Sequence, residues 1–386
     1  MTDRRGDWSF PTAVRFGAGR LAELAEAARA AGLARPLLVS DRGLAGSEIV
    51  ARARGILSDA GLGDAVFAEV GQNPDETDLA AGLAAFREGG HDGVVAIGGG
   101  SALDLGKLVA LMAGQTRPVW DFEDVGDRWT RADAAAIRPI VAVPTTAGTG
   151  SEVGRAGVLT DAAKGRKVIV FHPRMLPAQV ICDPELTLGL PRALTVGTGF
   201  DALAHNLEAW LSPHWQPLCA GIALEGLRLA LAALPRVAAR PDDLGARADM
   251  MAAAAMGAIA FQKGLGAIHA LSHPIGARFG THHGTTNAVV APAVLDWLLP
   301  TQRRKLDEAA AHAGVAGGAE GLLARIGALR AELGVPDTLG DLGVPREAIP
   351  ALIPGVLADP SCGGSPVALD AAAAAALLEA AFRPTR

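Results

Sequence analysis

Four side chains in the second half of the chain have the types and the spacing of ligands to one divalent metal ion. Asp201 and His205 are four residues apart in GTGFDALAHNLEAW, which places a carboxylate and an imidazole on one face of an expected helix. His269 lies on a second expected helix, in GLGAIHALSHPIG, and His283 lies at the start of a third, in THHGTTN. Three imidazoles and one carboxylate suit Zn²⁺ or Fe²⁺ better than Ca²⁺ or Mg²⁺, which prefer oxygen ligands.

Each histidine also has a plainer interpretation, because a lone histidine on an apolar helix is usually a core residue. Six of the nine histidines lie between positions 205 and 283, several at helical ligand spacing, and this clustering favours a metal site for the set. His269 and His273 repeat the H-x-x-x-H spacing of zinc proteases, but Ala270 stands where the catalytic glutamate would follow the first histidine. The sequence therefore disfavours a metal hydrolase.

Two glycine-rich segments each follow an apolar run that predicts a strand. The first, GVVAIGGGSALDLGKLVAL, predicts a strand, a glycine turn and a helix. Ser101 and Asp104 form an S-x-x-D pattern that is typical of a helix start, and exposed backbone N–H groups at a helix start bind phosphate. It departs from the G-x-G-x-x-G pattern, and Pro118 stands where an acidic ribose ligand would be sought. The second, PTTAGTGSE at 144–152, suits a cofactor phosphate or the nicotinamide amide, with a capped turn as the alternative.

Asp41 ends the apolar run RPLLVSD and has two interpretations. Its carboxylate could accept hydrogen bonds from both hydroxyls of an adenine ribose and repel a 2′-phosphate, which would favour NAD over NADP. It could equally cap a helix that begins near Leu44.

The composition favours a small-molecule function. A length of 386 residues exceeds the usual size of a single core and predicts two domains. Lys and Arg number 35 against 41 Asp and Glu, a net charge of −6 without long runs, which argues against nucleic acid or a membrane as partner. The 3 cysteines lack C-x-x-C spacing, and residues 1–16 lack the features of a signal peptide, so reduced cytoplasm is the expected compartment.

The elements that must position these residues follow from the apolar pattern. Between residues 35 and 113 short apolar runs alternate with helical periods, and these repeated βα units predict a parallel sheet covered by helices. A run at 139–146 extends that sheet, and runs at 168–173 and 178–184 could add strands, while the loop at 114–138 is either an excursion near a ligand cleft or a solvated connector. We expect an α/β domain over 1–185 and an all-α domain over 186–386.

Taken together, the motifs resemble the iron-containing (group III) alcohol dehydrogenase family. The matching segments are GGGSALDLGK, PTTAGTGSEV, TGFDALAHNLEA and GLGAIHALSHPIG followed by HHGTTNA, and the likeness runs from about Phe16 to Leu299. It implies a dinucleotide-binding α/β domain and a helical metal-binding domain, a plan shared with dehydroquinate synthase. The related maleylacetate reductases carry Asn where Asp201 stands, which places this chain nearer the metal-dependent branch. Many relatives have an N-P-R motif where this chain has Gly364-Ser365-Pro366-Val367.

The resemblance implies roles for individual residues. Asp201, His205, His269 and His283 match the metal ligands, and His273 matches a histidine implicated in proton relay. The cofactor-contacting places correspond to Asp41, Asn73, Gly98, Gly99, Gly100, Ser101, Asp104, Thr145, Thr146, Thr149 and Lys167. The expected cofactor is NAD rather than NADP, and the expected ion is Fe²⁺, with Zn²⁺ as the alternative.

We therefore predict a cytoplasmic, homodimeric enzyme that reversibly oxidises an alcohol and passes hydride to NAD, with the metal acting as a Lewis acid. The alternative is a lyase or cyclase of the dehydroquinate synthase type, whose polyanionic substrate would require a dense Lys and Arg cluster that the sequence lacks. A short hydroxy acid, its semialdehyde or a diol is the expected substrate. Lys263 and Arg155 are candidate anchors for its carboxylate, although each could equally be an ordinary surface residue.

Overall fold

The computed structural model describes residues 12–384, which divide into two compact units. Residues 12–146 and 150–189 form what we term the α/β unit, and residues 147–149 and 190–384 form the helical unit. The fold class expected from the sequence, a parallel-sheet domain followed by a helical domain, is confirmed. Residues 1–11, which contributed to the expectation about a signal peptide, lie outside the described part of the chain.

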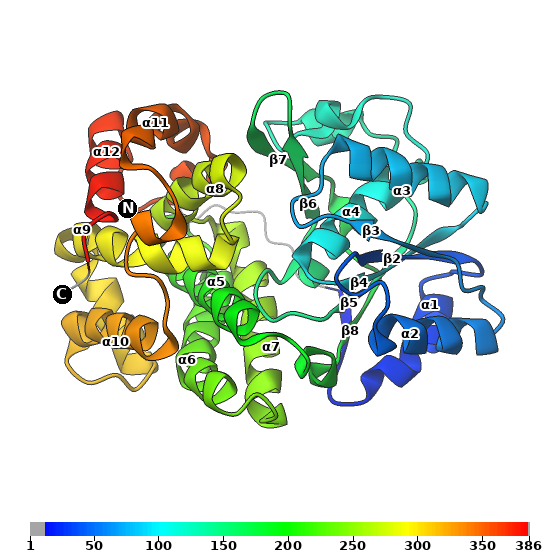
Figure 1. The fold of residues 1–386 in the computed structure, drawn as a ribbon, viewed down its shortest axis with the longest axis horizontal. Coiled ribbons are helices and arrows are strands. Elements are labelled where there is room, and N and C mark those ends of the chain that lie inside the picture. Colours follow the sequence, from blue (N-terminus) through cyan, green and yellow to red (C-terminus); the bar gives the residue numbers. More distant parts are fainter. Residues whose placement is uncertain (1–11, 385–386) are drawn as a thin grey trace. The chain divides into compact units, whose positions relative to one another are not determined.

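A six-stranded parallel sheet forms the centre of the α/β unit (Figure 1). Its central strands are buried along almost their whole length, as the continuous apolar runs predict for a sheet covered on both faces. The strands lie in the order β1 (Ala13–Phe16), β8 (Gln179–Cys182), β5 (Ile140–Pro144), β4 (Gly93–Gly98), β2 (Pro36–Asp41) and β3 (Val66–Val70).

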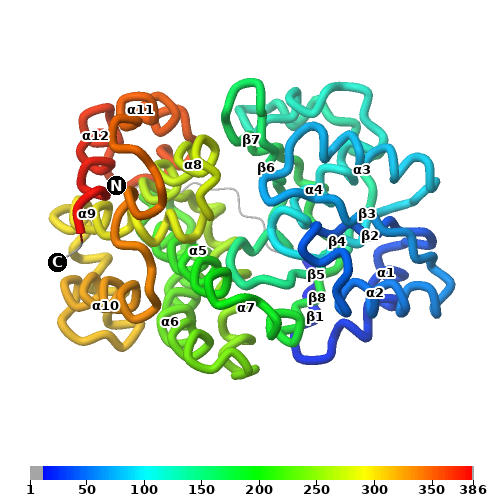
Figure 2. Tube along the Cα trace, in the orientation of Figure 1, coloured from blue at the N-terminus to red at the C-terminus, as the bar shows by residue number. Residues whose placement is uncertain are grey.

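Helices cover both faces of this sheet, and Figure 2 traces the chain as it alternates between strand and helix. On β4, Val95 and Ile97 face the core shared with α1 (Leu24–Ala30) and α2 (Glu48–Asp59). Val94 and Ala96 alternate with them and lie against Gly106 of α4 (Gly100–Met112), which packs beside α3 (Glu76–Glu88). The short helices η1 (Arg20–Glu23) and η7 (Pro184–Thr187) also belong to this unit.

The start of α4 differs from the expected Ser101–Asp104 cap. Gly99, in an extended conformation, takes the N-cap position, and the helix begins at Gly100. Ser101 therefore already lies in the first turn, where its hydroxyl donates to the Gln72 carbonyl at 2.6 Å instead of capping the helix. The first turn of α4 consequently has no side-chain cap on its N–H groups.

The run at 168–173 contributes a strand, but not to the parallel sheet. β7 (Arg166–Phe171) pairs with β6 (Ala156–Asp161) in a separate antiparallel hairpin. The excursion at 114–138 folds into three short turns, η2 (Val119–Phe122), η3 (Arg128–Arg131) and η4 (Ala134–Ala136), and η5 (Ser151–Val153) and η6 (Pro173–Met175) flank the hairpin. Glu123 ties the excursion to the hairpin, since its carboxylate accepts hydrogen bonds from Arg128 at 2.8 Å and Arg166 at 2.5 Å.

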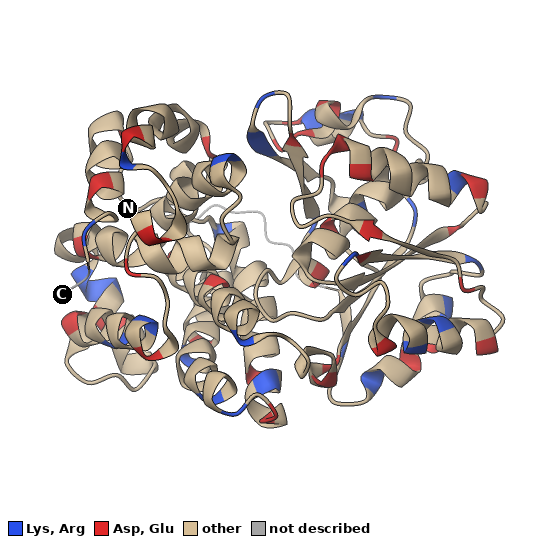
Figure 3. Cartoon of the chain, viewed as in Figure 1, with Lys and Arg blue, Asp and Glu red and all other residues tan. Residues whose placement is uncertain are grey.

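The helical unit is built around α5 (Arg192–Leu211), which packs against α6 (Pro217–Ala239), α7 (Leu244–Ala260) and α9 (His283–His312). The short helix η8 (Phe261–Lys263) follows α7 directly. α6 and the α7–η8 segment are long and apolar enough to cross a membrane by length and composition alone, but they pack on each other and on α5 as core helices. Acidic and basic residues are interspersed along the helices without long runs of one sign (Figure 3). The remaining elements are α8 (Ala267–Phe279), α10 (Gly318–Leu333), η9 (Gly340–Leu342), η10 (Arg346–Ala348), α11 (Ile349–Ala358), η11 (Pro360–Gly364) and α12 (Ala371–Ala380).

Backbone-to-backbone packing brings the start of α9 against α5. A Cβ atom on Gly284 would lie 2.0 Å from the Gly197 carbonyl oxygen and 2.9 Å from the Asp201 Cβ. No residue larger than glycine fits that space without moving one helix. This close approach places His283, the first residue of α9, beside the middle of α5.

Two lysines bind the free carbonyls at the end of α5. The Lys263 ammonium donates to the Ala209 carbonyl at 2.9 Å and to that of Ser212, and Lys305 donates to the carbonyls of Trp210 and Ser212 at 3.0 and 2.9 Å. Their N–H groups satisfy carbonyls that the end of a helix leaves without intrahelical partners. Lys263 is only 5% exposed, so the hypothesis that it anchors a substrate carboxylate is wrong.

We predict that Lys263→Met lowers the free energy of unfolding by about 1–3 kcal/mol, the cost of leaving buried acceptors unsatisfied. Burial and the nearby Lys305 lower the pKa of Lys263 to about 7, from 10.5 in the unfolded chain. Between these values the unfolded protein binds more protons, so the stability contributed by Lys263 rises with pH. Urea unfolding at pH 7 and pH 9 should therefore show a larger deficit for the variant at pH 9, and an equal or smaller deficit would contradict the assignment.

Candidate metal centre and cofactor site

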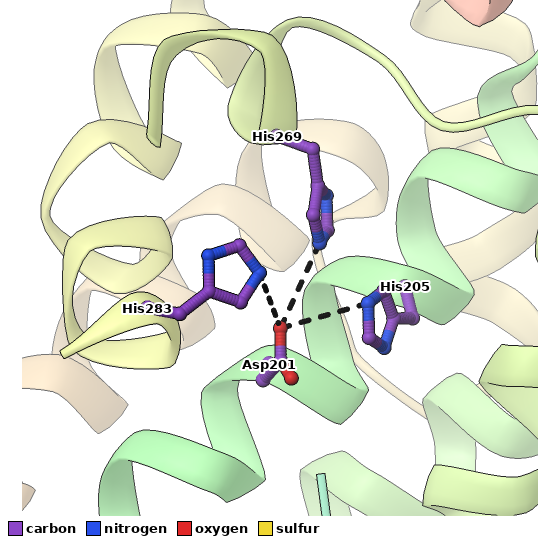
Figure 4. A group of neighbouring side chains, drawn as sticks. All are labelled: Asp201, His205, His269 and His283. Atoms are coloured by element: carbon purple, nitrogen blue, oxygen red, sulfur yellow. Dashed lines mark ion pairs between the residues drawn. The ribbon is translucent and has the colours of Figure 1, made fainter. Parts of the chain in front are cut away.

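Three imidazole nitrogens converge on one carboxylate oxygen inside the helical unit (Figure 4). The Asp201 Oδ1 atom lies 3.6 Å from the Nε2 atoms of His205 and His269 and 3.3 Å from that of His283. α5 supplies the first two residues one helical turn apart, α8 supplies His269, and α9 supplies His283. The structure thus brings together the four ligands proposed from the sequence.

The spacing of these atoms fits a metal ion. Metal–ligand bonds of about 2.1 Å in a tetrahedral site separate neighbouring ligand atoms by roughly 3.4 Å. The three distances to Asp201 Oδ1 bracket that value, and the four ligand atoms all lie within 4.8 Å of one another. A donor set of three nitrogens and one oxygen suits Fe²⁺ and Zn²⁺ alike.

The electrostatics of the cluster favour the protonation states that a metal requires. Burial opposes ionisation of Asp201, yet the adjacent His205 and His283 hold its pKa well below its usual range. Burial lowers the pKa of His205 to about 4 and that of His283 to about 3, so both rings are neutral at neutral pH. His269 differs: despite burial, hydrogen bonds to Asp201 and Glu208 raise its pKa to about 9, so a bound ion must displace a proton from this ring.

Glu208 supports the site and was missed by the sequence analysis. Its Oε2 atom lies 2.6 Å from the His269 Nδ1, and its Oε1 accepts a hydrogen bond from the Ile268 N–H at 2.7 Å. Because a carboxylate only accepts, Nδ1 keeps its hydrogen toward Glu208, and the proton that His269 loses on metal binding comes from Nε2, which then faces the metal. The sequence did carry a signal, since Glu208 is seven residues after Asp201 and so lies on the same face of α5.

Asn287 is a second residue that the sequence analysis missed. It follows His283 by one turn of α9, and its Nδ2 atom lies 2.9 Å from Asp201 Oδ1. The same nitrogen lies 3.3 Å from the Nε2 atoms of both His269 and His283. Asn287 is fully buried, so its amide is a fixed polar group at the centre of the cluster.

Two further histidines of the cluster, His273 and His282, are neighbours of the ligands in space or in sequence. His273, one turn beyond His269 on α8, stacks on His283 with ring centroids 5.1 Å apart and an interplanar angle of 15°. His282 is the N-cap of α9, where its Nδ1 accepts a hydrogen bond from the Thr285 N–H at 3.3 Å. The ring of His273 is therefore next to the candidate metal centre without contributing to it.

In the α/β unit, the proposed cofactor residues gather at one edge of the sheet. Asp41 ends β2, Asn73 follows β3, the glycine turn follows β4, and Thr145 and Thr146 follow β5. These four strands are neighbours and parallel, so their carboxyl ends share an edge. The chain order reverses between β2 and β4, and such a switch point is where doubly wound sheets bind ligands.

The glycine turn at this edge fits a dinucleotide phosphate. Gly98 has φ +147°, and a Cβ there would lie 2.7 Å from both the Ala102 Cβ and the Asp41 Oδ2. The turn leads into the uncapped start of α4, whose N–H groups form an anion-binding helix end. Asp41 accepts hydrogen bonds from the N–H groups of Leu44 at 3.1 Å and Gly99 at 3.4 Å, so it braces the turn on which its ribose contact is proposed.

The structure places the remaining proposed cofactor residues differently. The Asp104 carboxylate is engaged by the protein: it accepts from the Ser151 hydroxyl at 2.5 Å and the Val158 N–H at 3.0 Å, and pairs with Lys107 at 3.1 Å. Asp104 thus holds the segment before β6 against α4. Lys167 lies on β7 opposite Thr160, and Thr149 belongs to the helical unit.

Family models match both parts of the chain. The model described as iron-containing alcohol dehydrogenase matches residues 11–184, and the model of the C-terminal part of the Fe-containing alcohol dehydrogenase family matches residues 195–382. Together they span almost the whole sequence.

Individual relatives agree with these matches. The chain is 40% identical over 358 residues to a 4-hydroxybutyrate dehydrogenase of Cupriavidus necator, covering 90% of this chain and 92% of that protein. A solved 1,3-propanediol oxidoreductase has a TM-score of 0.93 at 33% identity, covering 98% of this chain and 100% of the other. The sulfoacetaldehyde reductase of Bifidobacterium kashiwanohense, solved in complex with NAD⁺, has a TM-score of 0.87 at 30% identity, with coverage of 97% and 98%.

We predict that Glu208→Gln weakens metal binding by about 10–100-fold, the usual effect of losing an outer-shell partner. The glutamine carbonyl can still accept from the Ile268 N–H, but its NH₂ group then faces His269 Nδ1 and forces the hydrogen onto Nε2. Competition between the protein and a chelator for Zn²⁺ measures the affinity. Glu225→Gln, at a surface ion pair with Arg228 on α6, is the matched control, and equal affinities for both variants would refute the role of Glu208.

Proposed function

This chain belongs to the iron-containing alcohol dehydrogenase family, and on that premise we propose that it oxidises short hydroxy acids at their terminal hydroxyl with NAD. The observation that carries the proposal is the convergence of three imidazoles on the Asp201 carboxylate, in a chain that also has an uncapped glycine turn at a sheet switch point. The first supplies a metal centre and the second a dinucleotide site. A lyase of the dehydroquinate synthase type is not favoured, because the relatives are named as dehydrogenases and reductases.

In the proposed reaction, Asp201, His205, His269 and His283 would hold a divalent ion, with Fe²⁺ favoured over Zn²⁺, and a bound ion would supply a Lewis acid that lowers the pKa of the substrate hydroxyl. Glu208 fixes the metal-facing nitrogen of His269. Burial excludes water from three of the four ligands, which strengthens every electrostatic interaction among them. His273, whose ring contacts those of His269 and His283, would accept the proton that the alcohol releases.

The residues of the α/β unit would bind and orient NAD, which supplies the hydride acceptor when bound. Gly98, Gly99 and Gly100 would contact the phosphates through backbone N–H groups, with Asn73, Ser101, Thr145 and Thr146 around the same edge. Asp41 would accept hydrogen bonds from the ribose hydroxyls and disfavour a 2′-phosphate. The cytoplasmic location and the homodimer expected from the sequence stay predictions.

The substrate class rests on the relatives rather than on a located anchor. The 4-hydroxybutyrate dehydrogenase and the sulfoacetaldehyde reductase are named for substrates with an anionic end, which supports a hydroxy acid here. Lys263 is removed from the candidate anchors by its burial at the end of α5. Arg155 stays a candidate, and its guanidinium lies over the Phe171 ring, 5.3 Å from the centroid, in the α/β unit.

We predict that a panel of alcohols, diols and hydroxy acids will give the highest kcat/KM for a short ω-hydroxy acid such as 4-hydroxybutyrate. NADH formation, followed by absorbance with Fe²⁺-loaded and Zn²⁺-loaded enzyme, measures the rate. NAD should be preferred over NADP, because the Asp41 carboxylate repels a 2′-phosphate.

The variant that tests the cofactor preference is Asp41→Ser. It should lower the ratio of kcat/KM with NAD to kcat/KM with NADP, without changing the order in which the substrates are preferred. Better turnover of simple alkanols than of every hydroxy acid would remove the substrate proposal and leave a general alcohol dehydrogenase. Equal kcat/KM for NAD and NADP in the unaltered enzyme would remove the role of Asp41.

A further inference from the structure

We propose that Asp359 is a positioning residue for His273, and that this is what the C-terminal segment contributes to the reaction. The proposal rests on the proposed role of His273 as acceptor of the alcohol proton. Asp359 lies between α11 and η11, 86 residues beyond His273 in sequence, and its Oδ2 atom is 2.8 Å from the His273 Nδ1. Both α11 and η11 pack directly against α8, the helix that carries His273.

The hydrogen bond between Asp359 and His273 determines which ring nitrogen of His273 carries the hydrogen. Asp359 is largely buried, and despite that burial His273 and Ser361 keep its pKa below the usual value, so it is a carboxylate with acceptor atoms only. The hydrogen of the His273 ring must therefore sit on Nδ1 and donate to Asp359. Nε2 is left as the acceptor nitrogen, and it is the atom that would take the proton from the substrate hydroxyl oxygen.

Contacts on two sides fix the orientation of this ring. Asp359 holds its Nδ1 edge, and the ring of His283 stacks on its face with centroids 5.1 Å apart. His269 approaches it edge-on, with centroids 5.7 Å apart and an interplanar angle of 65°. Among the described residues, Asp359 makes the only hydrogen bond that selects the Nδ1–H tautomer of His273, and without it the ring is free to present an N–H instead of a lone pair toward the substrate hydroxyl.

Asp359 also has a purely structural role that the experiment must separate. Its Oδ1 atom accepts a hydrogen bond from the Ser361 N–H at 2.9 Å and so caps η11. Asparagine can keep this cap through its carbonyl, since Asn and Asp are comparable N-cap residues. Its NH₂ group then faces His273 Nδ1, which reverses the tautomer while the fold around η11 is kept.

The test is Asp359→Asn, alone and combined with His273→Ala. We expect Asp359→Asn to lower kcat by about 10–100-fold, a loss of the size that is typical for the hydrogen-bond partners of metal-ligating histidines, with bound metal and the KM for NAD unchanged. In the His273→Ala background the same substitution should have no further effect on kcat. In ¹⁵N-histidine NMR spectra of the metal-free protein, the His273 hydrogen should move from Nδ1 to Nε2 in the Asp359→Asn variant.

Asp370→Asn is the matched control, because Asp370 caps α12 by accepting from the Ala373 N–H at 2.8 Å and has no histidine partner among the described residues. It should leave kcat and the NMR spectrum unchanged. The inference is overturned if His273→Ala lowers kcat but Asp359→Asn does not, or if Asp359→Asn lowers kcat equally in both backgrounds. An unchanged kcat in His273→Ala alone would instead remove the proposed proton role of His273, and retention of the Nδ1 hydrogen in Asp359→Asn would still refute the positioning role.

Discussion

The buried carboxylate of Asp201 is the constraint on which the helical unit depends. An ionised group with 2% exposure is costly unless it is paired and hydrogen-bonded. Three imidazoles and the Asn287 amide surround it, and they come from three helices, α5, α8 and α9. The Gly284 contact lets α9 approach closely enough for His283 to reach the same oxygen. The packing that brings these three helices together therefore also forms the candidate metal centre.

The α/β unit instead presents backbone N–H donors at one edge of its sheet. Here the carboxyl ends of adjacent parallel strands do the positioning, and Asp104 and Lys107 secure the following segment against α4. The division of labour matches the chemistry proposed, since a dinucleotide needs many moderate contacts, whereas a metal ion needs a few ligands held rigidly. Two carboxylates outside the ligand set, those of Glu208 and Asp359, each lie within hydrogen-bond distance of the Nδ1 atom of one imidazole. The two histidines of α8, His269 and His273, are therefore oriented in the same way.

Local spacing explains what could be predicted from the sequence. Asp201 and His205 share a helical face because of their four-residue separation, and the parallel strands followed from continuous apolar runs. Contacts between residues distant in sequence could not be predicted in this way. No local pattern links Asp359 to His273. Lys263 is close in sequence to the helix that carries His269, which suggested a role at the metal site, whereas the structure shows it bound to carbonyls at the end of α5. Ser101 failed as a cap because Gly99, whose extended conformation cannot be read from the sequence, takes the N-cap position two residues earlier. Helical periodicity places Glu208 on the same face of α5 as Asp201, but its role depends on the hydrogen bond to His269, which only the structure shows.

The central claim is that Asp201 and three histidines of the helical unit bind one divalent ion. Calorimetric titration of chelator-treated protein with Zn²⁺, compared between the unaltered chain and Asp201→Asn, tests it most directly. The account predicts one ion per unaltered chain and a loss of affinity in the variant that exceeds the roughly 10–100-fold typical of outer-shell partners. Binding of one ion with the same affinity to both proteins would contradict it.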